Sequence, residues 1–69
     1  MKILIIGASG MLGRALSKHL GNVYEVYGIG RSKFETNRIE YIKLDLLEKN
    51  KIELYLSLNK FDLIINLAA

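Results

Sequence analysis

Short apolar runs alternate with two stretches of helical periodicity along this chain. The runs at residues 2–6 and 61–67 are almost continuously apolar, which is typical of strands buried on both faces of a sheet. Residues 23–29 and 39–44 are rich in β-branched and aromatic side chains and predict two further strands. The polar segment 31–38 is expected to be a loop.

Two amphipathic segments predict the helices. The first is expected over residues 11–20, before Gly21-Asn22, because glycine and asparagine commonly follow the last helical turn. Its predicted apolar face is formed by Leu12, Ala15, Leu16, His19 and Leu20. The second is expected over residues 47–58, with a face formed by Ile52, Tyr55, Leu56 and Asn59 and widened by Leu54 and Leu58.

The order strand, helix, strand, strand, helix, strand predicts an α/β fold with a parallel sheet. In a doubly wound sheet the strands would lie in the order 3-2-1-4, and right-handed crossovers would place one helix on each face. The result is a three-layer α/β/α arrangement. A ligand is expected between the first and fourth strands, at their carboxyl ends.

Three glycines, Gly7, Gly10 and Gly13, are spaced as G-x-x-G-x-x-G between the first strand and the first helix. A glycine turn that leads into a helix binds the pyrophosphate of a dinucleotide through unpaired amides and the helix dipole. Gly7 would permit the tight turn, Gly10 the approach of the pyrophosphate, and Gly13 the packing of the helix. The predicted pyrophosphate segment comprises Gly7, Ser9, Gly10, Met11, Leu12 and Gly13.

This motif makes the predicted fold the N-terminal part of a Rossmann domain, still incomplete at residue 69. The alternative is an ordinary turn with incidental glycines. A nucleoside-triphosphate loop is not indicated, because no Gly-Lys-Ser/Thr follows.

Arg31 and Ser32 directly follow the second strand, at the position that normally contacts the adenosine ribose. An acidic residue there would favour NAD. A guanidinium can instead pair with the 2′-phosphate of NADP, and Ser32 can add a hydrogen bond. The sequence therefore favours NADP(H), with NAD(H) left open because arginine can also stack on adenine. A solvated loop arginine is the other interpretation.

Two segments at the ends of later strands complete the predicted site. Asp45 follows the third strand and could cap a helix, hold a turn, or accept a hydrogen bond from the adenine amino group. The small residues Ala68 and Ala69 would let the cofactor lie against the end of the fourth strand. Asn66 could equally tie down a turn there.

Length and composition limit the remaining possibilities. Sixty-nine residues form at most one small domain, and no cysteine or histidine cluster could build a disulfide or zinc site, so no metal is expected. The net charge of +3 is spread along the chain without an aromatic-interleaved basic stripe, so nucleic acid is not expected as a partner. The apolar runs are too short for a membrane span, and the first is too short for a signal peptide, so no membrane is expected and the protein is interpreted as cytoplasmic. The fourth strand would be an uncharged apolar edge, which suggests the opening part of a longer protein.

Taken together, Gly7-x-x-Gly10-x-x-Gly13, Arg31, Asp45-Leu46 and Asp62-x-x-x-Asn66-Leu67-Ala68-Ala69 resemble the N-terminus of an extended short-chain dehydrogenase/reductase, a superfamily that includes NAD-dependent epimerases and dehydratases. The branch it resembles most is the sugar-nucleotide reductase group of dTDP-4-dehydrorhamnose reductase. Many epimerases and dehydratases carry His where this chain has Asn66.

The resemblance implies that Leu46 joins Asp45 at the adenine and that a nucleotide-linked 4-keto sugar is reduced by NADPH. It places the catalytic Tyr-x-x-x-Lys pair beyond residue 69, so this segment would hold cofactor without performing chemistry. It also implies a homodimer for the full-length protein. A nucleotide-sugar epimerase or dehydratase with tightly bound NAD, and a non-catalytic dinucleotide-binding module, are the alternatives.

Overall fold

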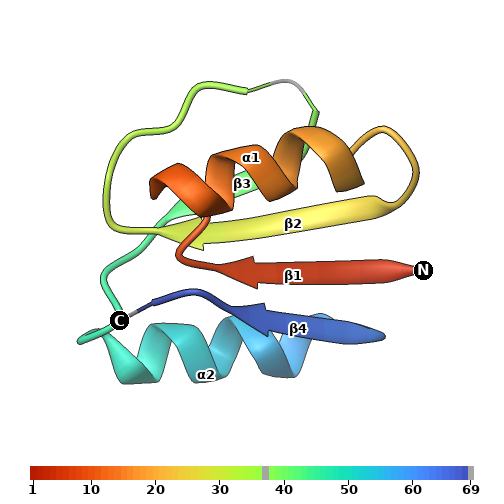
Figure 1. Cartoon of the computed structure of the whole chain (residues 1–69). Helices are drawn as coiled ribbons and strands as arrows, with labels where there is room; N and C mark the ends of the chain where they lie inside the picture. Colours follow the sequence, from red (N-terminus) through yellow and green to blue (C-terminus); the bar gives the residue numbers. More distant parts are fainter. Residues whose placement is uncertain (37, 69) are drawn as a thin grey trace.

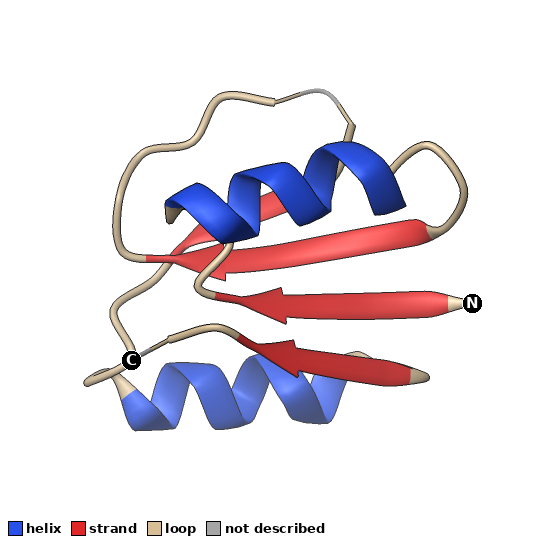
Figure 2. Cartoon of the chain, in the orientation of Figure 1, coloured by secondary structure: helices blue, strands red, loops and turns tan. Residues whose placement is uncertain are grey.

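Four parallel strands form one sheet with a helix on each face (Figures 1 and 2). The computed structural model describes residues 1–36 and 38–68. In chain order the elements are β1 (Lys2–Ile6), α1 (Met11–Leu20), β2 (Glu25–Gly30), β3 (Glu40–Lys43), α2 (Lys49–Leu58) and β4 (Leu63–Asn66). The sheet order is β3-β2-β1-β4, so the predicted three-layer, doubly wound α/β fold is confirmed.

Strand β1 is central, and its side chains serve both layers. Ile3 and Ile5 face α1 and pack with Val26, whereas Leu4 lies in the opposite cluster with Ile29. All three β1 side chains are buried. This explains the continuous apolar run at the start of the sequence, because successive side chains of a strand point to opposite faces and both faces here are covered.

The bounds of β1 and α1 are as predicted, whereas the other four elements are shorter than the sequence predicts. Val23 and Tyr24 lie in the turn after α1, where both amides donate to the Leu20 carbonyl, at 3.0 and 2.8 Å. Strand β2 therefore begins only at Glu25. Helix α2 begins at Lys49 because residues 45–48 form a hydrogen-bonded turn. The predicted second strand began two residues too early because Val23 and Tyr24 are strand-forming residues that lie in the turn.

The predicted face of α1 is confirmed for Leu16 and Leu20 and is wrong for Leu12, Ala15 and His19. The helix buries Gly13 and Ser17, and Leu16 and Leu20 pack beside them, whereas the Leu12 side chain is 60 % exposed. Ala15 and His19 are exposed as well. Two small residues, Gly13 and Ser17, allow the helix backbone to approach the sheet closely, with Leu16 and Leu20 packed beside them. On α2, Ile52, Tyr55 and Leu56 do pack on the core as predicted, but Leu54 and Leu58 are exposed.

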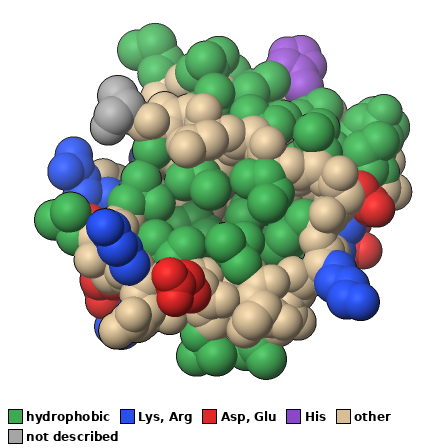
Figure 3. Space-filling model, turned by 90° about the horizontal axis from the view of Figure 1, so that it is seen from below, with side chains coloured by type: hydrophobic (Ala, Val, Ile, Leu, Met, Phe, Trp, Pro, Cys, Tyr) green, Lys and Arg blue, Asp and Glu red, His purple; other side chains and the backbone are tan. Residues whose placement is uncertain are grey.

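Strand β4 forms one edge of the described sheet and pairs with β1. Its Leu63 and Ile64 side chains are exposed, and Figure 3 shows apolar side chains gathered on the surface seen from this side. Within residues 1–36 and 38–68, neither helix has the length and apolar character needed to cross a bilayer.

Candidate functional site

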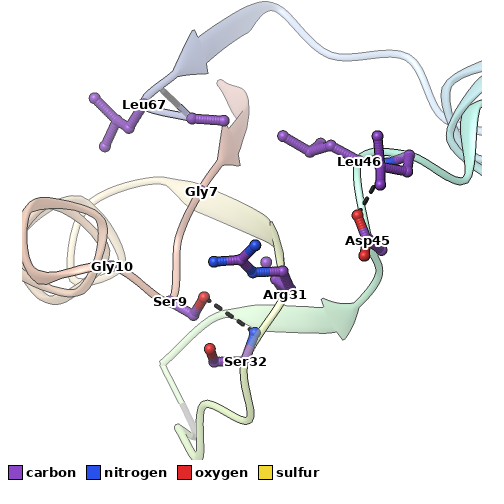
Figure 4. Close-up of a pocket in the computed structure, with 11 residues that line it drawn as sticks. Gly7, Ser9, Gly10, Arg31, Ser32, Asp45, Leu46 and Leu67 are labelled. Atoms are coloured by element: carbon purple, nitrogen blue, oxygen red, sulfur yellow. Dashed lines mark hydrogen bonds between the residues drawn. The ribbon is translucent and has the colours of Figure 1, made fainter.

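A pocket of about 500 Å³ lies at the carboxyl ends of the strands (Figure 4). It is lined by Gly7, Ser9, Gly10, Gly30, Arg31, Ser32, Asp45, Leu46, Leu47, Leu67 and Ala68. Four segments that are distant in sequence thus meet near the carboxyl ends of β1 and β4, where the strand order switches direction. This is the position in an open parallel sheet at which ligands bind.

Gly7 makes the turn that leaves β1. Its φ is +87°, a conformation that L side chains rarely adopt. The amides of Gly7 and Ala8 both donate to the Ile29 carbonyl, at 2.8 and 3.0 Å, which ties the turn to β2. A Cβ at Gly7 would also lie 3.0 Å from the Ala68 nitrogen, so the glycine allows the end of β4 to close against the turn.

Gly13 places α1 against this turn. It is buried, and a Cβ there would lie only 2.6 Å from Ala8 Cα. The role predicted for Gly13, close packing of the helix, therefore has a direct geometric cause. Gly13 does not line the pocket but holds the helix end that does.

Gly10 differs from the other two glycines, because the fold itself leaves room for a side chain there. A Cβ at Gly10 would meet only the Gly7 carbonyl oxygen, at 3.6 Å. Gly10 is the N-cap of α1, no side chain caps this end by a hydrogen bond, and the first turn carries no acidic residue. Backbone amides and the positive end of the helix dipole are thus left available to an anion in the pocket.

Arg31 and Ser32 lie where the chain leaves β2, and both are exposed. Figure 4 shows the Arg31 side chain between Ser9 and Asp45, on the pocket side of the strand end. The Ser32 amide points to the Ser9 hydroxyl, at 3.5 Å. The pyrophosphate turn and the segment expected at the ribose are therefore neighbours in the structure.

Asp45 is a turn residue, as one of its predicted roles required. Its Oδ1 accepts from the Leu47 amide at 3.0 Å, and its own amide donates to Glu48 Oε1 at 3.3 Å. The helix cap is Glu48 rather than Asp45, so that part of the prediction is wrong. Lys51, 2.6 Å from Glu48 Oε2, lowers the pKa of Glu48 and so keeps this acceptor charged. The adenine role of Asp45 stays a prediction.

The end of β4 forms the remaining wall. The Leu67 amide donates to the Ile6 carbonyl at 2.8 Å, and Asn66 Oδ1 accepts from the Ala68 amide at 3.0 Å. Asn66 thus ties down the turn after the strand. Because Ala68 is small, the wall beside Gly7 is largely backbone.

Not every predicted residue lines the pocket. Met11 and Leu12 lie at the exposed first turn of α1 outside it, with Met11 92 % exposed, and Ala69 lies outside the described residues. Gly30, Leu47 and Leu67 line the pocket without having been predicted. Gly30 could have been found, since it directly precedes Arg31 at the end of the second strand. Within the described part of the chain, no group of His, Asp or Glu side chains could hold a metal ion.

Residues 3–69 match the model of the NAD dependent epimerase/dehydratase family. This chain belongs to that family. The superfamily resemblance seen in the sequence is thereby confirmed, while the rhamnose reductase branch is not shown. No curated protein matches the chain.

Several solved structures have the same fold as this chain. Uronate dehydrogenase from Agrobacterium tumefaciens has a TM-score of 0.79 at 23 % identity, over 96 % of this chain and 25 % of that one. UDP-glucose 4-epimerase from Thermotoga maritima, solved with UDP-glucose, has a TM-score of 0.78 at 23 % identity, over 100 % and 24 %. UDP-glucuronic acid 4-epimerase from Bacillus cereus, solved with NAD, has a TM-score of 0.76 at 27 % identity, over 100 % and 27 %. The chain thus spans about a quarter of the length of these neighbours.

Proposed function

We propose that this chain forms the adenosine- and pyrophosphate-binding half of a dinucleotide site. The observation that carries the proposal is the uncapped N-terminus of α1, which opens into the pocket beside Gly10. The fold does not need a glycine at this position, whereas a phosphate approaching the helix amides does. A volume of about 500 Å³ is within the usual range of small-molecule sites.

The residues present fit such a cofactor. Gly7, Ser9 and Gly10 would surround the pyrophosphate, with Met11, Leu12 and Gly13 supplying or supporting the first helical turn. Arg31 and Ser32 would contact the adenosine ribose, and Asp45 and Leu46 would contact the adenine. Ala68 and Ala69 would let the cofactor lie against the end of β4. When bound, the nicotinamide supplies hydride chemistry; this segment binds and orients the other end of the molecule.

The choice between NADP and NAD depends on Arg31. A free guanidinium beside the ribose favours the extra phosphate of NADP. Membership of an NAD-dependent family and the NAD-bound Bacillus cereus neighbour support NAD. We propose NADP as the preferred cofactor, because Arg31 and Ser32, rather than an acidic residue, directly follow β2 at the position that would accept from a ribose hydroxyl.

For the intact protein we propose a cytoplasmic, homodimeric enzyme that reduces a nucleotide-linked 4-keto sugar. The presence of Asn66, in place of the histidine common in epimerases, supports this choice. Epimerisation is the second candidate, because the family model and two epimerase structures match.

Calorimetric titration of the intact protein with NADP and NAD tests the cofactor proposal. We expect NADP to bind more tightly, and Arg31→Ala to weaken NADP about tenfold more than NAD, as for one lost charge-assisted pair. Lys33→Ala, at an exposed residue on the same loop outside the pocket, is the control. Absence of binding by either dinucleotide overturns the proposed site, and tighter binding of NAD overturns only the role of Arg31.

A nucleotide-linked 4-keto sugar tests the activity. Consumption of the keto sugar with stoichiometric oxidation of NADPH supports the reductase. Interconversion of sugar epimers without net oxidation of the cofactor supports the epimerase instead.

A further inference from the structure

The loop that carries Arg31 and Ser32 is held by two side chains that do not line the pocket, Arg14 of α1 and Tyr41 of β3. We infer that Arg14 and Tyr41 are positioning residues that fix this loop for the adenosine ribose. The inference rests on the proposed dinucleotide site. It adds residues that neither the glycine motif nor the Arg31 position indicates.

Tyr41 holds Ser32 by a hydrogen bond from β3. Its hydroxyl donates to the Ser32 carbonyl, while the Ser32 amide points to the Ser9 hydroxyl at 3.5 Å. Both polar backbone atoms of Ser32 therefore have a partner, one from β3 and one from the pyrophosphate turn. Because the amide and the carbonyl of Ser32 are both held, we expect the side chains of Ser32 and of Arg31 before it to keep one orientation.

Arg14 links the same loop to the turn. Its Nε donates to the Ser9 carbonyl at 2.8 Å, and its Nη2 donates to the Lys33 carbonyl at 3.2 Å. A guanidinium has its donors in a rigid plane, so two such bonds fix the separation of the two carbonyls. Two of its donors are used on backbone carbonyls, one of the turn and one of the loop, so Arg14 can act on the ribose site through the loop.

Phe34 completes the contact between the two residues. The Arg14 guanidinium carbon lies 4.9 Å from the centre of the Phe34 ring, and the Phe34 and Tyr41 rings pack edge to face at 5.3 Å. Arg14, Phe34 and Tyr41 form one continuous cluster along residues 32–34. We call this cluster the loop clamp.

Gly30 explains why the clamp can form. A Cβ at Gly30 would lie 2.5 Å from Ser9 Oγ and would overlap the Tyr41 hydroxyl. The two hydroxyls thus converge on space that a side chain at the end of β2 would otherwise occupy. An acidic residue at this position would exclude the clamp, so the loop is positioned by hydroxyls from outside β2.

Two ligands separate positioning from general stability. Both 5′-ADP and inorganic pyrophosphate carry a diphosphate for the glycine turn, but only ADP has a ribose that reaches the clamped loop. In the intact protein we expect Tyr41→Phe, which keeps the ring and removes the hydroxyl, to weaken ADP about fivefold by calorimetry, the effect of one hydrogen bond. The affinity for pyrophosphate should change less than twofold, because the glycine turn is untouched.

A second variant tests whether the two residues act together. Arg14→Lys keeps the charge and loses the planar pair of bonds, and we expect a loss of ADP affinity similar to that of Tyr41→Phe. The double variant should lose less than the product of the two single effects, because both hold the same loop. Tyr24→Phe, in the turn at the other end of β2, is the matched control and should bind both ligands as the original protein does.

The outcomes are distinct. If Tyr41→Phe leaves ADP affinity unchanged, or reduces the affinities for ADP and pyrophosphate equally, the positioning role is wrong while the site stands. The same holds if Arg14→Lys leaves ADP affinity unchanged. If the effects of the two substitutions simply multiply, Arg14 acts independently of Tyr41 and the clamp is wrong. If the unsubstituted protein binds neither ligand, the proposed function fails and the inference fails with it.

Discussion

Helices α1 and α2 cover opposite faces of the same sheet but are attached to it differently. On α1 the buried residues are the small Gly13 and Ser17, so backbone lies close to the strands. No residue of α2 is fully buried. The half-buried side chains of Ile52, Tyr55 and Leu56 lie between the helix backbone and the sheet. The helix with the smaller buried residues is the one whose N-cap, Gly10, lines the pocket.

The two helices therefore contribute differently: α1 is constrained in its position, and α2 mainly buries apolar surface. Close backbone contact leaves α1 no freedom to shift without moving the Gly7 turn, which suits a helix whose N-terminus must meet a ligand. Contact through large side chains lets α2 contribute apolar burial with less positional constraint. Substitutions should therefore affect binding on the α1 side and stability alone on the α2 side.

The largest effect is expected at Gly13. In Gly13→Val the added side chain would overlap Ala8 and the Gly7 carbonyl, with a cost of about 3 kcal/mol in the free energy of unfolding and loss of nucleotide binding. Leu56→Ala on α2 should cost about 2 kcal/mol and leave binding intact. Urea unfolding and dinucleotide titration of both variants measure the contrast. Normal binding by a folded Gly13→Val protein would show that α1 can shift freely after all.

A smaller contrast is expected between two hydroxyl groups. Ser17 on α1 is buried and donates to the Gly13 carbonyl at 2.7 Å, so Ser17→Ala should cost about 1 kcal/mol. The buried Tyr55 hydroxyl on α2 has no partner among the described residues, so Tyr55→Phe should be neutral or stabilising by up to about 1 kcal/mol. Thermal unfolding of the two variants tests this sign difference. Destabilisation by Tyr55→Phe would reveal a partner for its hydroxyl.

The smallest effect is expected at high pH, on the α2 side, where Tyr27 packs with Phe61. A hydrogen bond to Glu25, at 2.5 Å, is the main cause that raises the pKa of Tyr27 from 10.0 to about 12. A raised pKa stabilises the fold while the phenol is protonated, so this contribution is complete below pH 10 and lost as pH rises toward 12. Ultraviolet titration of tyrosinate should show late-ionising tyrosine, and Tyr27→Phe should remove part of this late signal. Ionisation of Tyr27 near pH 10 would contradict the assignment.

The fold could be predicted because its determinants are local. Continuous apolar runs indicate strands covered on both sides, and β1 shows both coverings in Ile3, Leu4 and Ile5. The turn at Gly7 could be predicted for a similar reason, since a strand followed by spaced glycines and a helix has few other solutions. The face of α1 could be predicted only for Leu16 and Leu20, because periodicity weights large apolar residues, whereas Gly13 and Ser17 are buried for being small.

The candidate site was predictable in part. Gly7, Ser9, Gly10, Arg31, Ser32, Asp45, Leu46 and Ala68 were expected from their places at strand ends, and all of them line the pocket. The loop clamp was not predicted, because Arg14, Phe34 and Tyr41 are far apart in sequence and none stands at the end of a strand.

By itself the sequence determined the order of elements, the parallel sheet and the glycine turn, because each depends on neighbouring residues and on the alternation of strand and helix. Only the tertiary structure decided how closely α1 lies to the sheet, which hydroxyls occupy the space beside Gly30, and what holds the loop of Arg31. These features depend on distances between segments that meet only after the crossovers have formed, and such distances leave no periodic signal in the chain.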